Sequence, residues 1–171
     1  MALGVDYVHQ DCSMARALEL VGERWTLLIV RDSLFGVRRF SDFQTHLEMS
    51  KAVLTQRLAG LVDAGLLERV PHGGRDEYVP TTALEGLWHV VFALNDWGGT
   101  QVPSPGGARR EFLHADCGTL LTGPGLCAHC GIAPGPRDVL MRPGPGIGDT
   151  VRPNAVSAAL RSTRRLLDPI R

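Results

Sequence analysis

Apolar residues recur at helical spacing through the first two thirds of the chain. The pattern predicts helices at residues 13–21, 25–34, 40–47 and 51–64. Ser50 is placed to cap the fourth of these helices, and Gly65 is placed to end it. The centre of residues 25–34 is apolar on every side, so periodicity alone also allows a strand there. Its length and its neighbours favour a helix.

A hairpin and a strongly apolar segment follow. Residues 66–70 and 77–80 are predicted to be two strands, and the Gly pair between them suits a hairpin turn. Residues 82–98 predict a fifth helix that carries apolar side chains on nearly all sides, and one small domain cannot cover such a helix. We therefore expect a second copy of the chain to cover part of it.

Pro and Gly at residues 102–110 indicate a linker that divides the chain. We expect a first domain at residues 1–101, a cysteine-bearing β segment at 111–148 and a short helical tail at 149–171. The apolar side of the tail is expected to pack on the fifth helix. The predicted fold class is mainly α with a small β wing, followed by a small C-terminal β segment that is similar to a zinc ribbon.

The C-terminal segment contains two matched pairs of metal-ligand residues. His114-x-x-Cys117-Gly and Cys127-x-x-Cys130-Gly share one spacing, and a Gly after such a turn readily takes a positive φ. Four N and S ligands predict a tetrahedral, structural Zn²⁺ site with no open position for catalysis. Two other interpretations stay open, namely an unmetallated hairpin with reduced thiols and a redox pair, since C-x-x-C lowers thiol pKa.

Composition narrows the setting. Lys plus Arg equals Asp plus Glu at 18 each, so binding of nucleic acid would have to rest on local patches. Hydrophobic residues make up 44% and charged residues 21%, which is typical of a globular protein. No apolar run approaches the ~20 residues of a membrane span, and the N-terminus lacks a signal pattern. We expect a cytoplasmic protein without a membrane partner, where clustered cysteines favour metal or redox chemistry over structural disulfides.

Seven short motifs follow one another between residues 11 and 99. They are Cys12-x-x-Ala15-x-x-Leu18, Gly22-x-x-Trp25-Thr26-x-Leu28-Ile29, Arg39-Phe40-x-x-Phe43, Ser50-x-x-x-Leu54-Thr55-x-Arg57-Leu58, Gly65-Leu66-x-x-Arg69, Tyr78-x-x-Thr81 and Trp97-Gly98. In this order they resemble the HxlR-type transcriptional regulators, winged helix-turn-helix proteins related to MarR. The resemblance implies a homodimer on double-stranded operator DNA, paired through its first and fifth helices. One departure lies at Pro80 to Leu84, where the family's usual Gly is missing, so the start of the fifth helix is less defined than its middle.

The resemblance also implies a DNA-contacting surface at the start of the fourth helix, because that end of a helix-turn-helix enters the major groove. Gln56 suits an adenine edge, Lys51 a guanine or a phosphate, and Ala52 a thymine methyl group. The other residues expected at this surface are Arg38, Arg39, Ser50, Thr55, Arg57, His72 and Arg75. Arginines before the third helix and on the hairpin are expected to hold phosphates, while Arg57 equally suits an internal ion pair.

The first interpretation is therefore a dimeric, sequence-specific DNA-binding repressor. Cys12 supports an alternative, because HxlR-like proteins with a Cys at this place include thiol-stress sensors. A small residue buried at the dimer contact is the preferred explanation of Cys12. The C-terminal cysteines are further candidates for such a switch. A metal or dithiol enzyme is not expected, since no acid in an H-E-x-x-H frame accompanies the site. A protein-interaction module and an unspecified small-molecule effector stay open.

Overall fold

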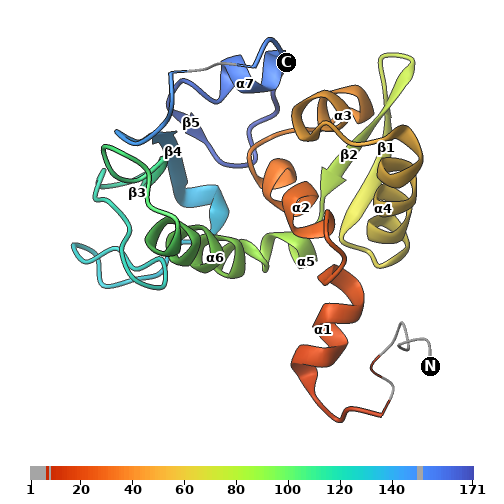
Figure 1. Ribbon diagram of the computed structural model, residues 1–171, viewed down its shortest axis with the longest axis horizontal. Helices are drawn as coiled ribbons and strands as arrows, with labels where there is room; N and C mark the ends of the chain where they lie inside the picture. Colours follow the sequence, from red (N-terminus) through yellow and green to blue (C-terminus); the bar gives the residue numbers. More distant parts are fainter. Residues whose placement is uncertain (1–6, 8, 150–151) are drawn as a thin grey trace.

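The computed structural model describes residue 7, residues 9–149 and residues 152–171. The domain limits expected from the sequence also include residues 1–6, 8, 150 and 151, which lie outside the described residues. We call residues 9–101 the head, and residues 102–149 with 152–171 the extension. Figure 1 shows the head on one side, the sheet of the extension on the other, and α6 between them.

The first four helices of the head confirm the predicted pattern. They are α1 (Ser13–Val21), α2 (Thr26–Leu34), α3 (Phe40–Leu47) and α4 (Lys51–Asp63). The ambiguous segment is a helix, α2, and it buries Ile29, Val30 and Leu34 completely. A helix that is apolar on most sides is stable here because α3, α6 and β2 contact it.

A two-stranded wing follows α4. Strands β1 (Leu67–His72) and β2 (Arg75–Pro80) pair antiparallel from Leu67 opposite Pro80 to His72 opposite Arg75. The strands are longer than predicted because Gly73 and Gly74 both have positive φ, at 55° and 79°. Such a pair closes a hairpin with only two turn residues. The strand limits expected at residues 70 and 77 are therefore wrong, because pairing continues to His72 and Arg75.

The predicted fifth helix is two helices, α5 (Thr82–Glu85) and α6 (Trp88–Gln101). The Thr81 side chain caps α5 by accepting a hydrogen bond from the Leu84 N–H. Gly86 ends α5, which agrees with the low helix preference of Gly. The break lets Trp88 turn fully into the core. The single helix at 82–98 was wrong at its start, where the sequence departs from the family pattern.

The extension is built on a three-stranded sheet in the order β3 (Arg110–His114), β4 (Val139–Pro143) and β5 (Arg164–Arg165). A short 3₁₀ helix, η1 (Pro136–Asp138), precedes β4, and α7 (Ala155–Ala159) precedes β5. The predicted linker is a packed loop rather than a free connection. The Ser104 hydroxyl donates to the Gly146 carbonyl at 2.6 Å, and Arg110 already belongs to β3.

The tail packs on α3 and on the corner after α2, whereas packing on the fifth helix was expected. The Leu167 N–H donates to the Leu34 carbonyl at 2.7 Å, and the Ile170 N–H donates to the Gly36 carbonyl at 2.9 Å. Gly36 has φ +97°, and a Cβ there would lie 1.9 Å from the Asp168 carbonyl oxygen. The missing side chain therefore permits this close approach. Figure 1 shows α7 next to α3.

Head and extension share one continuous hydrophobic core. Phe112 of β3 lies 5.2 Å from the Trp88 ring, 5.5 Å from the Phe92 ring and 6.2 Å from the Phe35 ring, measured between centroids. These tilted and edge-on contacts are the favoured arrangement of aromatic pairs. The extension therefore folds on the core of the head. Within the described residues, no helix is long and apolar enough to cross a membrane.

Candidate functional site

The start of α4 presents a polar, exposed surface. Ser50 caps the helix, and its hydroxyl accepts a hydrogen bond from the Val53 N–H at 3.3 Å. The residues that lie exposed at this end are Ser50, Lys51, Ala52, Thr55 and Gln56. Leu54, Leu58 and Leu61 are buried on the opposite side and fix the helix to the core. The three side chains expected to approach bases, those of Lys51, Ala52 and Gln56, are thus all exposed.

Arg38 does not belong to this surface. Its side chain is buried, with 4% of the residue exposed, and it donates to the carbonyls of Ser33, Val37 and Leu167 at 2.6–3.0 Å. Burial lowers the pKa of Arg38 to about 10. The guanidinium joins the head to the tail, a role that sequence reasoning missed because the partner lies 129 residues away. This position does not suit the expected phosphate contact.

Arg39 and Arg57 lie at the edge of the surface. The Arg39 Nε is 3.7 Å from the Glu77 Oε1, and its side chain is 41% exposed, so the head group stays accessible beside the wing. Arg57 is half-buried and donates to the Glu23 carboxylate at 2.8 Å. Of the two roles expected for Arg57, the structure favours the internal ion pair.

The wing brings two more of the expected residues to the surface. His72 and Arg75 face each other across the Gly pair, and both are exposed. Arg69, which was not expected at this site, lies on the same hairpin and pairs with Asp76. The start of α4, Arg39 and the wing turn are therefore the accessible positions of the expected set.

The four predicted metal ligands come together in the extension. One donor atom from each of His114, Cys117, Cys127 and Cys130 lies within 4.8 Å of all the others. The Cys117 Sγ is 3.5 Å from the Cys127 Sγ and 3.4 Å from the His114 Nδ1. A zinc ion with Zn–S bonds of about 2.3 Å holds tetrahedral sulfur ligands about 3.8 Å apart. The donor set and its spacing therefore fit Zn²⁺.

Backbone geometry explains why the two half-sites match. His114 ends β3 and Cys117 follows in a turn, which the Gly118 N–H closes by donating to the His114 carbonyl at 2.8 Å. The Gly131 N–H donates to the Cys127 carbonyl at the same distance. Gly118 and Gly131 have φ of 69° and 70°, a region that disfavours residues with a Cβ. These two turns are the local reason for the repeated Cys-Gly pair in the sequence.

The electrostatics of the cluster favour a cation. The Thr119 hydroxyl, 3.2 Å from the Cys117 Sγ, lowers the pKa of Cys117 to about 6. The hydrogen bond with Cys117, followed by desolvation, raises the pKa of Cys130 to about 11. Three sulfurs at this distance cannot all ionise without a compensating charge, because like charges oppose each other. Thr119 escaped sequence reasoning, since a Thr after Cys-Gly carries no distinctive signal.

Cys12 lies apart from the cluster, at the N-cap of α1, and it is exposed in the single chain. Its side chain makes no capping hydrogen bond. The thiol-sensing interpretation and the dimer-contact interpretation both stay predictions.

The helical head, the wing and the exposed start of α4 define a helix-turn-helix transcriptional regulator of the winged-helix class. The model of the HxlR-like helix-turn-helix family matches residues 20–105. The chain belongs to this family. The expected family resemblance is thereby confirmed, and so is the interpretation of a regulator rather than an enzyme.

Known relatives agree with this assignment. HTH-type transcriptional regulators of Mycobacterium tuberculosis and Mycobacterium bovis are each 42% identical over 137 residues, which cover 78% of this chain and 87% of the relative. The extension begins at residue 102 of 171. A match that covers 78% of this chain is longer than the part before residue 102, so it reaches into the extension. The crystal structure of PA1607, a candidate transcription factor, is 32% identical, has a TM-score of 0.58, and covers 70% of this chain and 91% of its own.

Proposed function

We propose that the protein is a homodimeric, sequence-specific repressor whose extension is stabilised by one zinc ion. The observation that carries the first part is the exposed start of α4, where Lys51, Ala52 and Gln56 face outward on a helix capped by Ser50. Backbone N–H groups at such an end attract phosphate, and side chains there reach base edges. A repressor then acts by occupying its operator.

Two exposed apolar faces support a homodimer. Helix α1 exposes Met14, Leu18 and Leu20, and Figure 1 shows this helix standing apart from the rest of the head. Helix α6 exposes Val90, Leu94 and Trp97, and 64% of Trp97 is accessible. Apolar patches of this kind on a soluble chain indicate a protein contact. A twofold dimer through α1 and α6 covers both faces and presents two copies of α4 to the DNA.

The experiment for DNA binding is genome-wide footprinting. Binding titrations on the recovered operators then compare the wild-type protein with three variants. Gln56→Ala is expected to change which operators are preferred, while Arg39→Ala is expected to weaken all of them alike. Ser41→Ala is a matched control, because Ser41 is exposed on α3 and, within the described residues, its hydroxyl hydrogen-bonds only to Asp42, at 3.4 Å. Identical profiles for Gln56→Ala and Arg39→Ala contradict the division between base reading and phosphate contact.

Light scattering tests the dimer. Trp97→Asp is expected to give a folded monomer, because Trp97 is exposed in the single chain and its loss leaves the core intact. A monomeric wild-type protein, or a dimeric Trp97→Asp variant, overturns the proposed contact.

The zinc ion is proposed from the Cys₃His donor set. His114, Cys117, Cys127 and Cys130 would hold it, and its charge would let all three thiolates exist side by side. Four protein ligands leave no position for water, so the ion would supply stability rather than catalysis. The His114 Nε2 lies 3.8 Å from the Asp116 Oδ2, so this carboxylate is placed to orient the imidazole while Nδ1 faces the sulfurs.

Metal analysis of the purified protein tests this proposal. About one zinc per chain is expected, consistent with one four-ligand site. Cys127→Ser is expected to lose the metal, while Cys12→Ser, which removes an exposed thiol far along the chain from the cluster, is expected to retain it. The proposal is contradicted if the purified wild-type protein is folded but contains no bound metal.

A further inference from the structure

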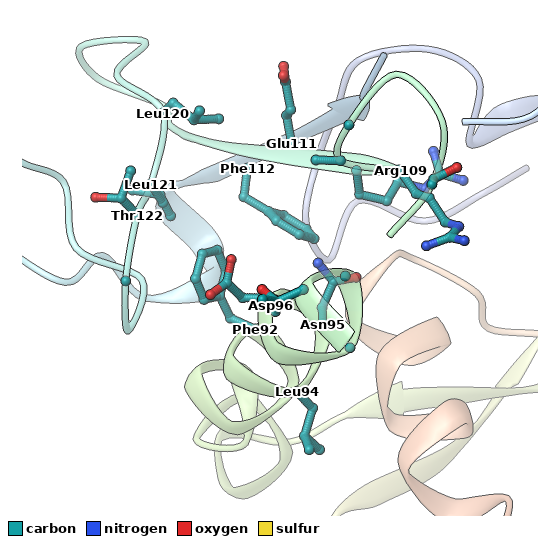
Figure 2. Close-up of a pocket in the computed structure, with 18 of the residues that line it drawn as sticks. Phe92, Leu94, Asn95, Asp96, Arg109, Glu111, Phe112, Leu120, Leu121 and Thr122 are labelled. Carbon is teal, nitrogen blue, oxygen red and sulfur yellow. The ribbon is translucent and has the colours of Figure 1, made fainter. Parts of the chain in front are cut away.

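A cleft of about 650 Å³ lies between α6 and the extension. Its floor is the C-terminal half of α6, and its other walls are the loop at 103–109, the start of β3 and residues 120–123. Figure 2 shows Phe112 reaching from β3 toward Phe92, Asn95 and Asp96 of α6. Ligand pockets of small molecules commonly have volumes of about 300–1,000 Å³. Sequence reasoning missed this cleft, because most of its walls lie outside the motifs of the family.

The cleft and the proposed dimer contact lie mainly on opposite faces of α6 and share only Leu94 among the residues named for the dimer contact. Phe92, Asn95, Asp96 and Gly99 line the cleft, and their spacing of three and four residues places them on one side of the helix. Val90, Leu94 and Trp97 have the same spacing but lie about half a turn away. In Figure 2, Leu94 points away from Phe112. Leu94 borders both surfaces, so a dimer formed through the exposed apolar face covers one margin of the cleft and leaves its remaining walls open.

One end of the cleft is positively charged. Arg109 and Arg110 both line it, and neither forms an ion pair with a carboxylate among the described residues. Desolvation, together with the neighbouring charges of Arg31 and Arg161, lowers the pKa of Arg110 to about 10. Nearby Asp32 is already held by Arg31 and by His46, each at 2.6 Å. This end therefore lacks an anion.

The two remaining acids of the cleft do not supply that anion. The Glu111 carboxylate accepts from the Arg142 Nε at 2.7 Å, and Figure 2 shows Glu111 pointing away from α6. Asp96 lies next to Phe92, whereas Arg109 lies near the opposite end of the lining. The amide of Asn95 lies between Phe112 and Arg109, and it makes no hydrogen bond within the described part of the chain. Asn95 thus offers a free N–H donor close to the cations.

The middle of the cleft is apolar, and its two aromatic rings, Phe92 and Phe112, are largely buried. Phe92 and Phe112 lie 5.5 Å apart between ring centroids, and Leu121 beside them is buried. Gly98 and Gly99 line the same space, and a Cβ at either would meet no atom within 4 Å. A Gly in a helix costs roughly 1 kcal/mol relative to Ala, so two in a row are unfavourable unless a neighbour approaches the backbone. The packing of this chain supplies no such neighbour.

We propose that the cleft binds an organic acid, that is, a carboxylate carried on a planar apolar body. The body lies against Phe92, Phe112 and the bare backbone at Gly99. The carboxylate accepts hydrogen bonds from the Arg109 guanidinium and the Asn95 amide, with the charge of Arg110 behind them. Asp96 repels a carboxylate at the other end and so sets the direction in which the ligand lies. This site is independent of the proposed DNA contacts.

Calorimetry with 2-naphthoate and its neutral counterpart 2-naphthamide tests the proposal on the full-length protein. We expect saturable binding of one naphthoate per chain and weaker binding of the amide. Arg109→Gln removes a charge from an exposed residue, and it is expected to weaken naphthoate about tenfold while changing the amide little. Asp96→Asn removes the repulsion and is expected to tighten naphthoate. Arg165→Gln, a change of the same charge on an exposed residue that does not line the cleft, is the control.

A steric variant keeps the test independent of charge. Gly99→Leu is expected to abolish binding of both compounds, because the added side chain fills open space in the cleft. Leu is also the better helix former, so the variant is expected to remain folded, which circular dichroism checks. The proposal is overturned by an absence of saturable naphthoate binding, by equal binding of acid and amide, or by unchanged affinity in Arg109→Gln or Gly99→Leu.

Discussion

Replacing Phe112 by Ala measures how far the extension depends on the head. Phe112 is 3% exposed and contacts three other aromatic rings, two of them on α6 and one just after α2. Truncating a buried Phe costs about 3–5 kcal/mol, and the loss of three ring contacts places this site at the upper end. We expect the free energy of unfolding to fall by about 4–5 kcal/mol and the midpoint of thermal unfolding by on the order of 10 °C.

Urea unfolding at fixed metal concentration is the appropriate assay. Tryptophan fluorescence monitors the head, and far-ultraviolet circular dichroism monitors the whole chain. Leu120→Ala is a matched control from the same segment, because Leu120 is 42% exposed and its loss is expected to cost less than about 1 kcal/mol. One shared transition that moves as a unit is the expected result. Two separate transitions, with only one of them shifted by Phe112→Ala, would refute the continuous core.

Three further changes have defined outcomes. In the metal-free protein, the lowered pKa of Cys117 means that its contribution to stability is complete above the ordinary pKa near 9 and is lost as the pH falls to about 6; Thr119→Val is expected to flatten this dependence in urea titrations, and an unchanged slope contradicts it. Gly36→Ala is expected to destabilise far more than Gly65→Ala in thermal unfolding, since both have positive φ but only the first meets a backbone oxygen, and equal losses would disprove the tail contact. Glu23→Gln is expected to leave Arg57 without its acidic partner and so to strengthen binding to DNA of any sequence, whereas unchanged affinity excludes a competition between Glu23 and phosphate.

The sequence predicts most of the head because each of its helices carries short-range sequence signals. The apolar spacing in α1 to α4, the cap at Ser50 and the Gly pair of the wing are short-range signals. The break at Gly86 is also local, but the apolar residues around it continue the helical pattern and conceal it. The exposed position of the start of α4 was predictable from its apolar spacing, whereas the burial of Arg38 depends on Leu167 and has no local signal.

The His/Cys cluster and the cleft also differ in how far short-range sequence signals predict them. The clustering of the three Cys and one His was predictable because each half of the cluster is a turn of four residues followed by Gly, and the repetition marks both halves. The cleft was not predictable, because it is formed by α6, the loop at 103–109, the start of β3 and residues 120–123, which come together only in the fold. Nothing in the order of Asn95, Arg109 and Phe112 along the chain indicates that they surround one space.

The backbone bonds from Leu167 and Ile170 to the corner at Leu34 and Gly36 set an order of events during synthesis. The corner leaves the ribosome early. The two backbone N–H groups that hydrogen-bond to it, those of Leu167 and Ile170, are added only after more than a hundred further residues. A nascent chain that already contains every residue of the helix-turn-helix therefore still lacks the two hydrogen bonds from the tail to its α2–α3 corner. Newly made molecules are expected to complete this corner only after translation has passed residue 170.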